Sequence, residues 1–270
     1  MPEFVLEMKN LSASWNKNSV LQNVSVVLHS GEFICLTGPN GSGKSTLLSL
    51  LAGIEMSGLT IDSAEKKPSL NGYELIHFSR KQIASHISYL TQTEVPSWNY
   101  SVRDVVLTGR YSHTNAFEHF SAKDIECVDS VLDAVQITNL ADRKIFSLSG
   151  GEFQKVRIAR ALAQEPDFLL LDEPIANLDF GYQTELLSLI KNLARGKIPS
   201  DKKPGVLVSI HDLNTAIRFS DNIMLLPKNG IPLSGQPEVV LTPQVLEQTY
   251  GVPFGTFIHP EYKCLQVFTK

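Results

Sequence analysis

Apolar residues recur along the chain with the two periods of regular secondary structure. Short, mostly apolar runs bounded by turn residues predict strands at 3–8, 24–28, 32–37, 87–91, 168–171 and 206–210. Apolar residues at three- and four-residue steps predict helices at 44–52 and 183–193. Alternating strands and helices are typical of a largely parallel sheet covered by helices. The pattern therefore predicts an α/β fold.

A helical pattern occupies the middle of the chain, where a subdomain is expected at about 97–163. The apolar positions at three- and four-residue steps are Val102, Val105, Val106, Ile125, Val128, Val131, Leu132 and Val135. The polar stretches 57–71 and 197–203 predict loops, and Thr242-Pro243 predicts a helix to about Thr249. With no internal repeat, we expect residues 1–270 to form a single domain with the helical subdomain inserted in its α/β core.

Composition narrows the class of protein. The chain has 270 residues, 43% hydrophobic and 19% charged, and it contains no apolar run long enough to span a bilayer. Its start lacks the features of a secretory signal, and its three separated cysteines have no metal-site spacing, so we expect a cytoplasmic protein. A net charge of -4 gives no basic footprint for nucleic acid.

A glycine-rich segment follows the strand predicted at 32–37 and precedes the helix predicted at 44–52. It fits the phosphate-loop pattern G-x-x-x-x-G-K-S. Glycines let the backbone wrap closely around phosphates, and the helix N-terminus supplies positive potential. We expect Lys44 to reach the β- and γ-phosphates of ATP and Ser45 to bind Mg²⁺. The nucleotide-binding candidates in this segment are Gly38, Asn40, Gly41, Ser42, Gly43, Lys44, Ser45 and Thr46.

Two carboxylates end the apolar strand predicted at 168–171. Adjacent strand residues point to opposite sides, so Asp172 and Glu173 can take different tasks. We expect Asp172 to accept from the Mg²⁺ shell and Glu173 to orient and deprotonate the attacking water.

The segment Leu148-Ser149-Gly150-Gly151-Glu152 resembles the signature of ATP-binding-cassette (ABC) proteins. Ser149 can cap a helix that begins near Gly151 and leave backbone amides free for a phosphate. Together with the phosphate loop, this segment identifies the chain as a member of the ABC family. The resemblance implies the phosphate-loop NTPase ABC fold, with a RecA-like core, an antiparallel β subdomain and an inserted α-helical subdomain.

The resemblance also assigns roles to single residues. It implies that Ser149, Gly150 and Gly151 bind the γ-phosphate held by an opposing subunit, so two chains are needed. It implies the Q-loop glutamine, also a Mg²⁺ ligand, at Gln92, the D-loop aspartate at Asp179 and the switch histidine at His211. Trp15 matches the aromatic residue that stacks on adenine, and packing in the core is its alternative role.

Three positions depart from the family pattern, namely Phe153, Ile175 and Asn177. None of the departures removes a charged or phosphate-contacting group. We therefore expect an active ATPase.

The segment from Ser101 to Arg110 resembles ATPases of importers for iron chelates, haem and cobalamin. In that subgroup the Q-loop and the helical subdomain receive the membrane permease, and the ATPase does not contact the cargo. The resemblance implies a peripheral protein on the inner face of the cell membrane that works as a dimer, most simply a homodimer.

Other classes stay open. The first is a soluble ABC ATPase that acts on nucleic acid or ribosomes, although 270 residues leave no room for the usual coiled-coil insertion or second cassette. The second is a phosphate-loop module that uses ATP only to regulate assembly, which is expected to lack Glu173 or His211. The third is an importer or exporter ATPase for another substrate.

Overall fold

The computed structural model describes residues 4–114, 119–176, 178–196, 202–228 and 230–270. Asn177 of the expected D-loop lies outside these residues, as do positions 197–201 of the loop expected at 197–203 and the first residue of the strand expected at 3–8.

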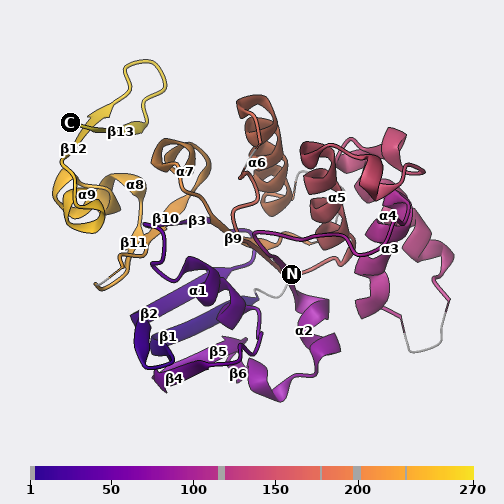
Figure 1. Ribbon diagram of the computed structural model, residues 1–270, viewed down its shortest axis with the longest axis horizontal. Coiled ribbons are helices and arrows are strands. Elements are labelled where there is room, and N and C mark those ends of the chain that lie inside the picture. Colours follow the sequence, from indigo (N-terminus) through magenta and orange to yellow (C-terminus); the bar gives the residue numbers. More distant parts are fainter. Residues whose placement is uncertain (1–3, 115–118, 177, 197–201, 229) are drawn as a thin grey trace.

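A mainly parallel sheet forms the centre of the molecule (Figure 1). Its strand order is β11-β10-β3-β9-β8-β7, and only the edge strand β11 runs antiparallel to its neighbour. The strands are β3 (Phe33–Thr37), β7 (Ile87–Leu90), β8 (Phe168–Leu171), β9 (Gly205–Ser209), β10 (Asn222–Leu225) and β11 (Leu233–Gly235).

Both faces of this sheet are buried, which explains the continuous apolar runs in its strands. In β8, Phe168 and Leu170 pack with the leucines of α1 (Lys44–Leu51). Leu169 and Leu171 point the other way and pack with residues of α5 (Gly150–Ala163), α6 (Phe180–Ala194) and α7 (Leu213–Phe219). Figure 1 shows α6 and α7 on one side of the sheet and α1 on the other.

An antiparallel sheet packs against α1 on its far side (Figure 1). The loop expected at 57–71 is wrong, because β4 and β5 lie there. The strand β4 is almost entirely exposed, so it lacks the apolar alternation that reveals a strand. The strand β5 contains Pro68, which lies where the β1–β5 register shifts between Glu7 and Lys9. The strands are β1 (Val5–Trp15), β2 (Asn18–His29), β4 (Leu59–Ser63), β5 (Lys66–Leu70) and β6 (Tyr73–Glu74).

Helices follow from residue 80 onward, and serine capping boxes start four of them. In each box a serine accepts from the third helical amide, and the side chain of that third residue accepts from the serine amide. These helices are α2 (Arg80–His86), α3 (Val102–Leu107), α4 (Ala122–Ala134) and α5. Of these, α3, α4 and α5 fall within 97–163, whereas the division of the chain into a core and an inserted subdomain stays a prediction. Short 3₁₀ helices connect them at η1 (Leu75–His77), η2 (Thr108–Ser112), η3 (Thr138–Leu140) and η4 (Ile145–Ser147).

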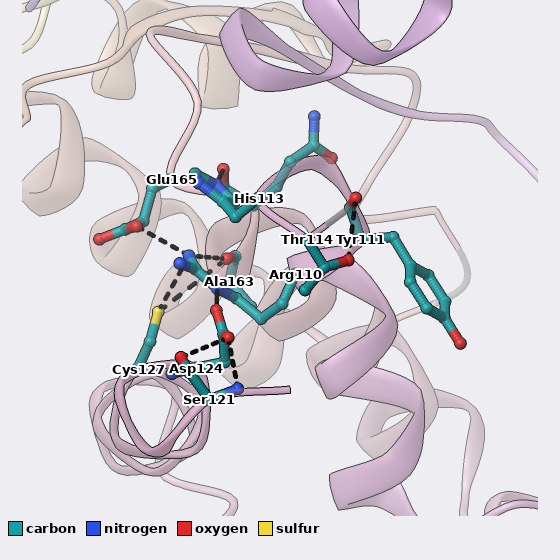
Figure 2. Close-up of polar contacts among 10 residues, drawn as sticks. Arg110, Tyr111, His113, Thr114, Ser121, Asp124, Cys127, Ala163 and Glu165 are labelled. Atoms are coloured by element: carbon teal, nitrogen blue, oxygen red, sulfur yellow. Dashed lines mark hydrogen bonds and ion pairs between the residues drawn. The ribbon is translucent and has the colours of Figure 1, made fainter. Parts of the chain in front are cut away.

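Arg110 joins three of these elements, although it is only 3% exposed (Figure 2). It donates to Asp124 Oδ1 at 2.9 Å, to the Ala163 carbonyl oxygen at 2.7 Å and to Glu165 Oε2 at 2.7 Å. Gly109 allows the close approach, because a Cβ there would lie 2.3 Å from the Arg160 carbonyl oxygen. The Gly-Arg pair therefore has a packing function in this chain: it ties η2 and α4 to the end of α5.

The C-terminal part begins as expected and ends differently. Thr242 caps α9 (Pro243–Tyr250), with Pro243 at its first position, and α8 (Pro237–Val240) precedes it. The hairpin of β12 (Phe254–Ile258) and β13 (Leu265–Thr269) was not predicted. Asn214 of α7 attaches it, since the side chain donates to the Val267 carbonyl oxygen and accepts from its amide. No helix in the described part of the chain has the length and apolar character that a bilayer crossing requires.

Candidate nucleotide-binding and hydrolysis site

The turn between β3 and α1 has a backbone that requires glycine. Gly38, Gly41 and Gly43 all have positive φ angles, of 148°, 78° and 96°. A Cβ on Gly38 would lie 2.2 Å from the Leu226 carbonyl oxygen, and one on Gly43 would lie 2.9 Å from the Val20 carbonyl oxygen. The loop is therefore held closely between β10 and β2.

The loop leaves donors available at the start of α1. Gly43 caps this helix with no side-chain hydrogen bond, unlike the serine-capped helices α2 to α5. Uncapped amides at a helix N-terminus suit an anion. Ser42 Oγ is buried and has no hydrogen-bond partner among the described residues. These features fit a bound phosphate.

Lys44 supplies a cation at the same place. Its Nζ donates to the carbonyl oxygens of Gly38 and Pro39 at 2.9 and 3.2 Å, and the residue is 6% exposed. Burial lowers the pKa of Lys44, and the nearby carboxylates of Glu173 and Asp172 oppose that shift. A phosphate that replaced the two carbonyl contacts would offset the cost of burying this charge.

A cavity of about 500 Å³ opens beside the loop. Three sheet strands, β7, β8 and β9, end near it and supply Gln92, Glu173 and His211. Carboxyl ends of parallel strands meet at one edge of a sheet, which brings these distant residues together. The lining residues are Val20, Asn40, Gly41, Gly43, Lys44, Ser45, Thr46, Gln92, Glu173 and His211.

Glu173 lies at the centre of this group. Gln92 Nε2 donates to Glu173 Oε2 at 2.6 Å, and His211 Nε2 pairs with Glu173 Oε1. The backbone of Glu173 has a φ of 48°, a left-handed conformation that costs a non-glycine residue about 1 to 3 kcal/mol. Such strain concentrates where a side chain must point in one direction.

Asp172 lies beside Glu173 and is only 2% exposed. Its Oδ1 accepts from Ser209 Oγ at 2.7 Å, and the same hydroxyl accepts from the Glu173 amide at 2.7 Å. A carboxylate, the Ser45 hydroxyl and the Gln92 amide oxygen are hard oxygen donors of the kind that Mg²⁺ takes. The chemistry of these residues therefore fits the expected metal.

Gly38, Ser42 and Asp172 do not themselves line the cavity, and three further groups of expected site residues do not line it either. In the described part of the chain Val20 lines it and Trp15 does not, although Trp15 Nε1 lies 3.4 Å from Thr46 Oγ1 as a hydrogen bond. Ser149, Gly150 and Gly151 start α5, which lies well apart from α1 in Figure 1. Asp179 is exposed and caps α6, where it accepts from the Tyr182 amide.

Ion pairs that were not predicted from the sequence join α5 to the segment after Gln92. Glu94 pairs with Arg160 at 2.6 Å and Arg157 at 3.1 Å, and Arg157 Nη2 also donates to the Thr91 carbonyl oxygen. Gln154 of the same helix donates to the Pro174 carbonyl oxygen at 2.8 Å. The signal in the sequence was the three-residue spacing of Arg157 and Arg160, which puts both on one face of a helix, together with the acidic Glu94.

The phosphate loop, the carboxylate pair and the serine-capped glycines of α5 define an ATP-binding cassette. The family model described as "ABC transporter" matches residues 21–176, and the chain belongs to this family. It is accordingly an ATPase with the ABC ATPase fold.

Two curated relatives and one solved structure are similar over most of their lengths. The ferric enterobactin transport ATP-binding protein FepC of Escherichia coli is 34% identical over 92% of this chain and 87% of its own. The hemin import ATP-binding protein HmuV of Nocardia farcinica is 35% identical over 89% and 79%. A metal-chelate type ABC transporter in an inward-facing conformation has a TM-score of 0.82 and 28% identity, covering 99% and 98% of the two chains.

Proposed function

We propose that this chain binds ATP with Mg²⁺ in the cavity beside the phosphate loop, hydrolyses it with Glu173, and as a dimer powers a membrane importer. The observation that carries the proposal is the meeting of Gln92, Glu173 and His211 in the cavity that the phosphate loop lines. The cavity, at about 500 Å³, also lies within the usual range for small-molecule sites, about 300 to 1,000 Å³.

The loop residues take the phosphates in this proposal. Lys44 contacts the β- and γ-phosphates, and the amides at the start of α1 contact phosphate oxygens. Ser45, Gln92 and Asp172 would hold Mg²⁺, which would supply positive charge to neutralise the transferred phosphoryl group. Trp15 or Val20 contacts the adenine side of the nucleotide.

Glu173 acts on the attacking water. Its two oxygens have different partners, Gln92 on Oε2 and His211 on Oε1, so the carboxylate plane is fixed before substrate arrives. A fixed carboxylate can orient water and accept its proton without reorganising. In this proposal His211 stabilises the carboxylate orientation and contacts the γ-phosphate.

The γ-phosphate requires a second chain. Ser149 caps α5 and donates to Glu152 Oε2 at 2.8 Å, which holds the first turn of the helix in shape. A Cβ on Gly150 would meet nothing within 4 Å, so packing within the chain gives no reason for glycine there. An approaching phosphate of an opposing subunit supplies that reason. Asp179, exposed at the start of α6, contributes to the same dimer contact.

The relatives suggest which machine the ATPase drives. FepC acts in ferric enterobactin transport and HmuV in hemin import, and the similar solved structure is a metal-chelate type transporter. We infer an importer for an iron chelate, haem or cobalamin. The permease binds the Gln92 loop and the helices at 97–163, so the chain lies on the inner face of the cell membrane and does not contact the cargo.

Glu173→Gln tests the catalytic assignment. The change keeps size and hydrogen bonding but removes the base, so phosphate release should fall by about 100-fold or more while ATP affinity stays within about twofold. Glu185→Gln on the surface of α6 is the matched control and should keep wild-type turnover. Wild-type phosphate release by Glu173→Gln would refute the role of Glu173.

Purification of the tagged chain from its native membranes tests the importer assignment. An integral membrane permease should co-purify, and adding ferric chelate or haem with its binding protein should stimulate ATP hydrolysis by the reconstituted complex. Recovery with ribosomes or nucleic acid in place of a permease would support the soluble alternative.

A further inference from the structure

Ser209 is a polar residue in a strand whose other residues are glycine, valine and leucine. It ends β9, it is fully buried, and it lies two residues before His211. A buried hydroxyl without hydrogen-bond partners lowers the stability of the folded protein. The partners of Ser209 therefore explain why a serine can occupy this buried position. Among the described residues the Ser209 side chain makes two hydrogen bonds, and both lead to the hydrolysis site, one to Asp172 and one to Glu173.

The two bonds use both capacities of one hydroxyl. Oγ donates its proton to Asp172 Oδ1 at 2.7 Å and accepts the Glu173 amide proton at 2.7 Å. The first bond fixes how the Asp172 carboxylate is turned. The second bond fixes the peptide group that leads into Glu173, where φ is 48°.

We propose that Ser209 is a positioning residue for ATP hydrolysis, because its hydroxyl holds the Asp172 carboxylate and the strained Glu173 backbone in one fixed arrangement. Misplacement of a reacting group by about 1 Å can cost about 100-fold in rate. The hydroxyl does not line the cavity, so it acts through its two neighbours. This inference rests on the proposed roles of Asp172 and Glu173.

Ser209→Ala removes both bonds at once. We expect kcat to fall by about tenfold or more while KM for ATP changes by less than about twofold. Ser209→Thr keeps the hydroxyl and should recover most of kcat. Ser69→Ala is the matched control, because Ser69 is equally buried but its hydroxyl donates to the Glu7 carbonyl oxygen in the antiparallel sheet. It should keep kcat within about twofold of wild type.

Hydrogen exchange supplies a readout without nucleotide. The Glu173 amide should exchange faster in Ser209→Ala than in wild type, Ser209→Thr or Ser69→Ala, while amides of β3 and β8 keep their protection. If Ser209→Ala does not fold, Ser209→Cys fills the same space with a weak donor and acceptor and should show both effects. Wild-type kcat in Ser209→Ala, or faster exchange spread over the whole sheet, would overturn the proposal.

Measuring Glu173→Gln in parallel distinguishes a failure of the catalytic role of Glu173 from a failure of the positioning role of Ser209. A hydrolysing Glu173→Gln protein would overturn the catalytic assignment itself. An inactive Glu173→Gln protein together with a fully active Ser209→Ala protein would overturn the role of Ser209 alone.

Discussion

Lys44 combines burial and charge in one side chain. Among the described residues its Nζ donates to two backbone carbonyl oxygens. Burial lowers its pKa, and Glu173 and Asp172 act in the opposite direction. A cation held in this way is well placed to bind an anion of higher charge. The residue therefore contributes more to nucleotide affinity than to the stability of the free protein.

We expect Lys44→Ala to weaken ATP binding by about 100-fold, the size of a buried charge-assisted contact. Equilibrium titration with a fluorescent ATP analogue measures it. Lys123→Ala removes an exposed lysine at the start of α4 and should leave the affinity unchanged. Unchanged affinity in Lys44→Ala would mean that the phosphates bind elsewhere.

At the same scale, the sequence indicated which residues of the fixed-spacing motifs come together, while their roles stay predictions. Lys44, Glu173 and His211 do line one cavity, as the phosphate loop and the strand ends indicated. It did not predict Ser209 or Val20, because their importance depends on which strands become neighbours. Strand order is set by long-range packing and cannot be derived from the period of a single segment.

The Arg110 network shows how one buried pair can fix several elements. Burial alone would raise the pKa of Asp124, but hydrogen bonds from Ser121 and Arg110 outweigh it and lower the pKa from 3.8 to about 2. The ionised form is therefore favoured by folding. Its contribution to the free energy of unfolding is complete above about pH 4 and is lost as the pH falls towards about 2.

We expect Asp124→Asn to lower the free energy of unfolding by about 3 kcal/mol near neutral pH, because it removes the more deeply buried of the two carboxylates that pair with the buried Arg110. The difference from wild type should shrink at about pH 3. Urea unfolding at about pH 6 and at about pH 3 measures it. Asp129→Asn breaks an exposed pair with Arg103 and should change little at either pH. A difference that does not depend on pH would contradict the assignment.

At the scale of elements, prediction succeeded where local chemistry marks a boundary. Thr242-Pro243 starts α9 and Ser149 caps α5, as their residue types indicated. It failed for β4 and for the hairpin β12–β13, which are short, partly exposed and stabilised by pairing with distant or neighbouring strands. The strand β4 has almost no buried residue and therefore no apolar alternation, whereas β13 buries Leu265 and Val267, and two buried apolar positions in five residues are too few to mark a strand.

The whole molecule presents the start of α1 and the start of α5 on different parts of its surface (Figure 1). In Glu173→Gln, which retains ATP, we expect a monomer without nucleotide and a dimer with ATP, whereas ADP lacks the bridging phosphate and should not support the dimer. Light scattering measures both states. The same measurement on the purified membrane complex applies if dimerisation depends on the permease.

Ser149→Arg added to that protein should abolish the dimer and leave ATP binding by the single chain intact. The arginine side chain would fill the space at the start of α5 that the γ-phosphate held by the opposing subunit should occupy. Ser130→Arg on the exposed surface of α4 is the matched control and should still dimerise. A Glu173→Gln protein that binds ATP yet stays monomeric, alone and in the complex, would contradict the composite site.

The strand order of the central sheet has a consequence for biosynthesis. The strand β3, which leads into the phosphate loop, lies between β9 and β10, and these neighbours are synthesised long after it. A nascent chain that has left the ribosome only as far as the carboxylate pair has neither of them, and Leu226, against which Gly38 packs, comes later still. Such long-range pairing forms late in folding. We therefore expect the newly made protein to gain its ability to bind ATP only when translation is nearly complete.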